Sequence, residues 1–129
     1  NVAELISKAE GGFAKAVKIA PNNASFNYNF GALYFNQATD VNEQMNAITG
    51  TSDADQKKYD DLKAKRDEYF SKSTPYFEKS YSIFGASEKD LKDNDRLTYK
   101  NTILALKEIY SRQNKMDKAA EMKAELEKK

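Results

Sequence analysis

Residues 13–34 read FAKAVKIAPNNASFNYNFGALY and contain the end of one predicted helix, a break and the start of the next. Before the break, apolar side chains recur at the spacing of one helix face. Pro21 ends this helix because it has no backbone N–H to donate. Asn22 or Asn23 can cap the next helix, since a side-chain oxygen accepts from the free N–H groups of a first turn. This stretch therefore predicts two consecutive helices joined by a short turn.

The same apolar spacing, followed in both directions, predicts five helices. No segment alternates apolar and polar residues over several positions, so we predict no strand and an all-α fold. The low counts of 5 Gly and 2 Pro agree with long helices. The predicted helices cover residues 2–20, residues 24–48, a long stretch from Asp53 that Gly85 ends, residues 95–113, and the chain from Met116 onward.

Residues that break or bend helices lead to specific expectations. Gly11 and Gly12 lie within the first helix, where each costs about 1 kcal/mol relative to Ala, so we expect another backbone to pack close to them. Gly50 follows the second helix and is expected to adopt the left-handed conformation. Pro75 lies inside the third helix, where we expect a kink near residues 72–74 and no break, because the apolar period continues through it.

Short polar residues indicate the other helix ends. Ser52 with Asp55 three residues later is a variant of the capping box, which predicts the start of the third helix. Ser87 with Asp90 predicts a capped short turn in the polar connector that follows. Asn114 predicts a left-handed residue before the last helix, because Asn visits this conformation more readily than most residues.

Composition excludes several classes of function. The 129 residues suit one domain, residues 1–129, and include 21 Lys and Arg, 20 Asp and Glu, no His and no Cys. The chain therefore has no Ser-His-Asp or Cys-His relay and no thiolate, and it lacks His, the commonest ligand of transition metals. A net charge of +1 gives no general attraction to nucleic acid or anionic lipid. No apolar run reaches about 18 residues, so we expect no membrane insertion.

Paired carboxylates are the remaining candidates for chemistry, as a general acid and base or as ligands of a hard cation. They lie in predicted caps and polar helix faces, where nothing removes water from them or shifts their pKa. We therefore predict a non-enzymatic protein with no catalytic residue, no cofactor and no metal site. The pairs are Asp53 with Asp55, Asp60 with Asp61, and Asp93 with Asp95.

Patterns near both ends of the chain carry a family resemblance. Phe13, Ala16 and Pro21 stand at the spacing that closes the second helix of a tetratricopeptide repeat (TPR), and residues 29–34, NFGALY, are very like the core of its first helix. Asn27 departs from this pattern, because the family prefers Trp there. Later positions resemble a further repeat with the family's nine-residue step from Tyr110 to Ala119, although Lys107 replaces a small residue. The matching later positions are Leu106, Tyr110, Asn114 and Ala119.

The middle of the chain resembles the same repeat with an insertion. Ser73, Phe77 and Ser80 take the second-helix positions, but Tyr34 and Ser73 are 39 residues apart where the family has nine. Shared between two helices, the excess is about 15 residues each, which lengthens each helix by roughly 22 Å. The sequence therefore predicts a projecting helical hairpin with its tip at residues 49–53.

The resemblance implies a TPR-like α-solenoid of antiparallel helix-pair repeats with one pair of extended helices. Residues 1–23 would be the second helix of a truncated repeat, residues 24–87 a repeat with the extended hairpin, and residues 95–129 the last repeat. Because residues 1–20 look like a second helix without its partner helix, and the chain begins at Asn1 instead of Met, we expect it to be the C-terminal piece of a longer array. Absence of Cys fits an exported or periplasmic protein, but cytosolic proteins of this kind are common, so the compartment stays open.

First helices of TPR repeats line a groove that holds a peptide or helix of a partner protein, and the resemblance implies the same function here. Asn29 takes the place of an Asn that contacts the ligand backbone in peptide-clamping members. The basic residues of a carboxylate clamp are replaced by Asn101 and Ala105, which disfavours that version. The predicted groove residues are Tyr28, Asn29, Ala32, Phe35, Asn36, Asn101, Ala105, Glu108 and Arg112.

Three other interpretations remain beside the groove. The polar groove residues would also be explained by simple solvation. Self-association through the hairpin or the first helix, giving a homodimer, is the alternative function. Nucleic-acid binding is disfavoured, because the 15 aromatic residues lie mostly on the apolar helix faces and the basic residues alternate with acidic ones.

Overall fold

The computed structural model describes residues 1–128, and within this range it contains helices and no strand. The predicted all-α fold is confirmed. The elements are α1 (Val2–Ile19), α2 (Ala24–Asn46), α3 (Asp53–Ala86), a short 3-10 turn η1 (Glu88–Asp90), α4 (Asp93–Arg112) and α5 (Met116–Glu127).

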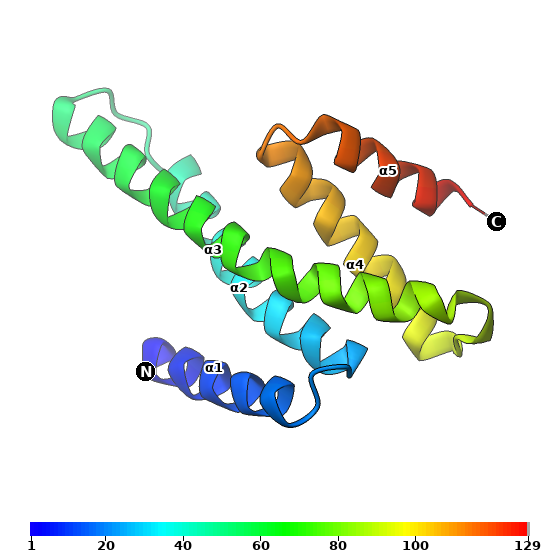
Figure 1. The fold of residues 1–129 in the computed structure, drawn as a ribbon. Helices are drawn as coiled ribbons and strands as arrows, with labels where there is room; N and C mark the ends of the chain where they lie inside the picture. Colours follow the sequence, from blue (N-terminus) through cyan, green and yellow to red (C-terminus); the bar gives the residue numbers. More distant parts are fainter. Residues whose placement is uncertain (129) are drawn as a thin grey trace.

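Helices that follow one another along the chain pack side by side (Figure 1). The most extensive contact joins α2 and α3, which run antiparallel, and α4 also touches α2. The loop between α2 and α3, residues 47–52, stands away from α1, α4 and α5 at the upper left of Figure 1. The half of α3 that follows Tyr69 instead lies between α2 and α4, where the core forms.

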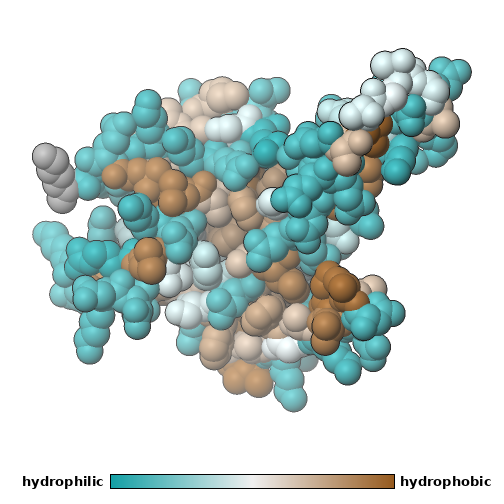
Figure 2. Space-filling model, turned by 180° about the vertical axis from the view of Figure 1, so that it is seen from behind, coloured by the Kyte–Doolittle hydropathy of each residue, from teal (hydrophilic) through white to brown (hydrophobic). Residues whose placement is uncertain are grey.

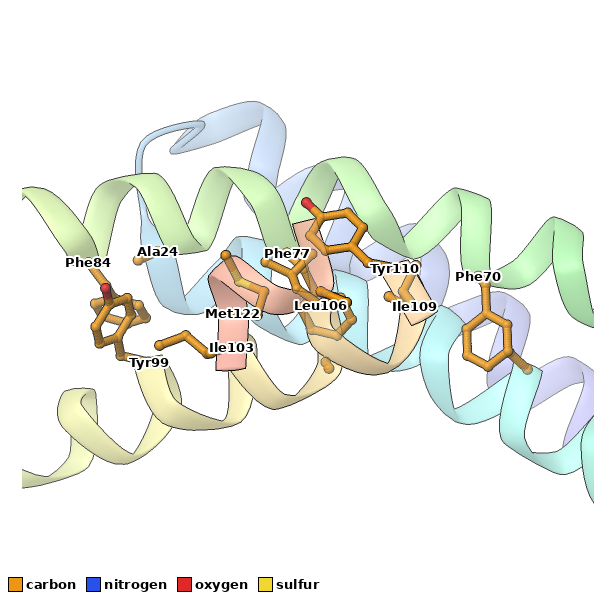
Figure 3. Close-up of a cluster of buried hydrophobic side chains, with 13 residues drawn as sticks. Ala24, Phe70, Phe77, Phe84, Tyr99, Ile103, Leu106, Ile109, Tyr110 and Met122 are labelled. Carbon is orange, nitrogen blue, oxygen red and sulfur yellow. The ribbon is translucent and has the colours of Figure 1, made fainter. Parts of the chain in front are cut away.

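The core follows one face of α3, on which Phe70, Phe77 and Phe84 recur every seven residues (Figure 3). Ser73 and Ser80 lie between them and are fully buried. Alternating large and small side chains let neighbouring helices approach between the rings. The buried cluster is completed by Ala24, Ala38, Tyr99, Ile103, Ala105, Leu106, Ile109, Tyr110, Ala119 and Met122.

Several predicted helix ends are confirmed by their hydrogen bonds. The Asn23 side chain accepts from the N–H of Phe26 at 3.0 Å, and Ser52 Oγ accepts from the N–H of Asp55 at 3.1 Å. Asn114 has a φ of 58°, the left-handed conformation that was predicted. Local side-chain chemistry therefore determines where α2, α3 and α5 begin.

The glycine predictions for α1 and the hairpin loop are wrong. A Cβ at Gly11 or Gly12 would meet no atom within 4 Å, so no backbone packs there. Gly50 does not have a positive φ. A Cβ at Gly50 would instead overlap Oδ2 of Asp55, the carboxylate to which Ser52 Oγ donates at 2.8 Å. Gly50 therefore makes room for the cap of α3.

The connector after α3 differs from the prediction at three points. The third helix ends at Ala86, one residue past Gly85, and α4 begins at Asp93 where Asp95 was expected. The Ser87 side chain makes no capping hydrogen bond to η1, whose turn is closed by the N–H of Asp90 and the Ser87 carbonyl at 2.9 Å. By contrast, α3 continues through Pro75 without a break, as predicted.

Candidate functional site

Most of the predicted groove residues line one hollow between α2 and α4, here called the α2–α4 groove. Its volume is about 270 Å³, and Phe77 of α3 contributes to its floor. This is slightly below the size of a typical small-molecule pocket. The groove therefore suits one or two side chains of a larger ligand. It brings together Tyr28, Ala32, Phe35, Asn36, Asn101, Ala105 and Glu108, with Leu104 in addition.

The floor of the groove is aromatic. Phe77 is 1% exposed, and its ring centroid lies 5.7 Å from that of Tyr28 and 6.0 Å from that of Phe35. A Cβ at Gly31 would lie only 3.0 Å from the Phe77 ring, so the ring fills the space that the glycine leaves. Phe35 also meets Phe70 edge-on at 5.5 Å. Close packing on several sides holds these rings in place beneath the groove.

Two asparagines lie at the rim of the groove, Asn36 on α2 and Asn101 on α4. Asn36 is exposed and Asn101 is half-buried. Neither side-chain amide makes a hydrogen bond to another residue of the described chain. Each amide therefore offers both a carbonyl acceptor and an NH₂ donor, the two groups that a peptide bond can satisfy.

Two predicted groove residues lie elsewhere. Arg112 places its guanidinium 5.4 Å from the centre of the Phe70 ring, and its Nη2 pairs with Oε1 of Glu108 at 3.2 Å. Arg112 does not line the groove itself and is connected to it by the ion pair with Glu108, which does. Asn29 is exposed on α2 and does not line the hollow.

Besides Phe77, two residues that matter for the groove were not predicted. Leu104 is 44% exposed and lines the hollow, and a sequence signal existed, because it is a large apolar residue off the apolar face of the fourth helix. Asn27 is 2% exposed, and its amide donates to the carbonyls of Pro21 at 3.0 Å and Asn23 at 2.9 Å. These bonds hold the turn before α2 and hence the position of Tyr28. The departure from Trp at Asn27 was the available signal.

Two tyrosines with raised pKa values lie at helix contacts outside the groove. Tyr34 donates to Oε2 of Glu10 on α1, and Tyr110 donates to Oε2 of Glu78 on α3. Burial is the main cause that raises the pKa of each tyrosine, and the neighbouring carboxylate raises it further. These neutral phenols therefore serve to join helices.

The groove offers binding chemistry: an aromatic floor, two free amides and one carboxylate that is already ion-paired. Among residues 1–128, no group of three or more Asp or Glu is placed to hold a metal ion. None of the described helices combines the length and apolar character needed to cross a membrane. Comparison of the chain with models of protein families, with curated proteins and with solved structures found no match.

Proposed function

We propose that this protein is a non-enzymatic, TPR-like interaction module that binds a peptide or helix of a partner protein in the α2–α4 groove. One observation carries the proposal. Side chains chosen from repeat positions in two separate parts of the sequence, from Tyr28 to Asn36 and from Asn101 to Glu108, line the same hollow. A mistaken repeat register would have scattered them over different helix faces.

Packing between the helices supports the repeat register. Gly31 and Ser73 take the two positions where the family has small residues, and both are buried between α2 and α3. Tyr34 and Tyr110 take the same repeat position, and each donates a hydrogen bond to a glutamate on the preceding helix. The projecting α2–α3 hairpin is a second surface that the partner would contact.

The chemistry of the groove indicates how a peptide would be held. Asn36 and Asn101 would pair with its backbone, while apolar side chains would pack against Phe35 and Leu104. Glu108 adds little charge because Arg112 already neutralises it. Binding is therefore expected to depend weakly on salt, since few charges would be screened.

A peptide-display selection on the purified chain tests this function. Selected peptides are measured by fluorescence polarisation against the double variant Asn36→Ala/Asn101→Ala, whose affinity should fall at least about tenfold. The matched control is Asn22→Ala/Asn94→Ala, which removes two exposed amides outside both the groove and the hairpin and should bind normally. Equal affinity of the peptides for both double variants would contradict the proposal.

One observation favours self-association through α1 as a second candidate function. This helix buries none of its residues, and Val2, Leu5 and Ile19 are 72%, 64% and 73% exposed. Figure 2 shows the apolar surface over the N-terminal part of α1 at the lower right. Light scattering over a range of concentrations tests this candidate. A monomer throughout would exclude it, whereas a dimer that Leu5→Glu dissociates and Lys15→Glu does not would support it.

A further inference from the structure

A second hollow lies at the opposite edge of α4 from the groove. It has a volume of about 440 Å³ and is bordered by η1, the N-terminal half of α4 and the last turn of α5. We call it the C-terminal pocket. Its volume falls within the range of small-molecule sites, which is not true of the α2–α4 groove.

The floor of the C-terminal pocket is apolar. Tyr99 and Ile103 are 6% and 3% exposed, and the half-buried Leu91 and Leu126 border them. Tyr99 is held by stacking on Tyr81 of α3, with 5.7 Å between ring centroids. Figure 2 shows apolar surface near the end of α5, at the left of the view. Because Tyr99 and Ile103 are almost covered already, an alkyl chain laid on this floor would remove from water mainly its own surface and that of Leu91 and Leu126, which favours binding.

The rim of the pocket is cationic. Lys89, Arg96, Lys100 and Lys128 line it together with only two acidic residues, Glu88 and Glu125. Lys128 Nζ pairs with Glu125 Oε1 at 2.7 Å, so this pair adds no net charge. Three cations then face one carboxylate, although the whole chain has a net charge of only +1.

The three remaining cations come from two elements. Arg96 Nη2 donates to the Leu91 carbonyl at 2.9 Å, which holds the guanidinium at the rim and leaves its other N–H groups to donate to a ligand. Neither Lys89 nor Lys100 forms an ion pair with any residue in the described part of the chain. Their ammonium groups are therefore available to an anion.

We propose that the C-terminal pocket binds an aliphatic carboxylate of medium chain length. The alkyl chain would lie on Tyr99 and Ile103, and the carboxylate would lie among Lys89, Arg96 and Lys100. A neutral alkyl compound would leave these cations without a partner, and a short anion would leave the half-buried Leu91 and Leu126 uncovered. Both parts of the ligand are needed to use the whole pocket, so the charge complements the rim and the chain complements the floor.

Isothermal titration calorimetry with octanoate, below its micelle concentration, tests this proposal on the full chain. Octanoate should bind at one saturable site, whereas acetate and 1-octanol should each bind at least about tenfold more weakly. Amide chemical-shift changes on adding octanoate should lie in residues 88–103 and 125–128. Equal binding of 1-octanol, or shift changes centred on the α2–α4 groove, would overturn the proposal.

A pair of double variants tests the role of the rim. Lys89→Gln/Lys100→Gln should weaken octanoate binding at least about tenfold. Lys63→Gln/Lys79→Gln removes the same charge from exposed positions on α3 and should leave octanoate binding unchanged. Arg96 is kept in both, because its bond to Leu91 also holds the connector. An equal effect of the two double variants on octanoate affinity would mean that the rim does not bind the carboxylate.

Discussion

Ser80 is a fully buried hydroxyl on the core face of α3. Its Oγ has no hydrogen-bond partner among the described residues, whereas Oγ of the equivalent Ser73 donates to the Phe70 carbonyl at 2.7 Å. A buried hydroxyl without a partner loses its hydration and gains nothing in return. The two serines therefore look alike in the sequence, but burying the Ser80 hydroxyl costs free energy that no hydrogen bond offsets.

Ser80→Ala should raise the free energy of unfolding by up to about 1 kcal/mol, because it removes an unsatisfied polar group and almost no volume. Ser73→Ala is the matched control and should lower it by about 0.5–1.5 kcal/mol, because it deletes a hydrogen bond. Urea denaturation measures both values. A loss of stability in Ser80→Ala as large as in Ser73→Ala would show that the Ser80 hydroxyl has a partner in solution.

Gly31→Leu should lower the free energy of unfolding by roughly 1–3 kcal/mol, because the new side chain must displace the Phe77 ring, 3.0 Å from its Cβ. Gly12→Leu is the control. No atom lies within 4 Å of a Cβ at Gly12, and Leu favours a helix more than Gly does, so this variant should gain up to about 1 kcal/mol. A change below about 0.5 kcal/mol in Gly31→Leu, again from urea denaturation, would mean that α2 and α3 do not approach closely at Gly31.

Buried tyrosines make stability depend on alkaline pH. Burial raises the pKa of Tyr34, Tyr99 and Tyr110 above the ordinary value, and carboxylates add to the effect. The folded state then keeps phenolic protons that the unfolded chain releases above about pH 10. The free energy of unfolding is therefore highest where these phenols are neutral in both the folded and the unfolded chain. It falls as pH rises and the unfolded chain loses its phenolic protons.

The free energy of unfolding should thus fall between pH 9 and pH 11, and Tyr110→Phe should reduce that fall because Phe has no proton to lose. Urea denaturation at the two pH values gives the slope. Tyr59→Phe, which removes the hydroxyl of an exposed tyrosine, is the control. A steeper fall in Tyr110→Phe than in the parent chain would contradict this assignment.

At the scale of elements, the sequence predicted those features that depend on neighbours along the chain. The caps at Asn23 and Ser52 and the left-handed Asn114 are local, so short-range chemistry determines them. Contacts at Gly11 and Gly12 depend on which other helix lies nearby, and apolar spacing carries no such information. The same holds for Gly50, whose neighbour is a carboxylate folded back from α3.

The groove residues also divide into those whose position follows from spacing along the chain and those whose position depends on packing. Repeat spacing placed Tyr28 and Glu108 on facing helix surfaces, and both line the hollow. Arg112 differs because a cation beside an aromatic face is stabilised there, and the Phe70 ring is within reach. Which of several nearby partners a long side chain selects is a property of the packed molecule, so the position of Arg112 could not be predicted from spacing.

At the scale of the whole molecule, the α2–α3 hairpin tip is separable from the core. The main buried cluster includes no residue between 43 and 62, and Met45 is the one buried side chain in that range. Replacing residues 43–62 with a short Gly-Ser loop should therefore preserve a cooperative unfolding transition, because Arg66 can still donate to Asn42 at the new end, at 2.9 Å in the intact chain. Circular dichroism during thermal unfolding measures this. Loss of the cooperative transition would show that the hairpin is required for folding.

The sparse packing of α1 has a consequence for the order in which the molecule opens. A helix with no buried residue, packed mainly on α2, can detach while α2, α3 and α4 remain together. Amide hydrogens of α1 should thus exchange with deuterium well before those of α3, and a peptide in the groove should slow exchange in α2 and α4 but not in α1. Mass spectrometry of exchanged peptides resolves this order. The chain would then have two melting units, of which only one holds the groove.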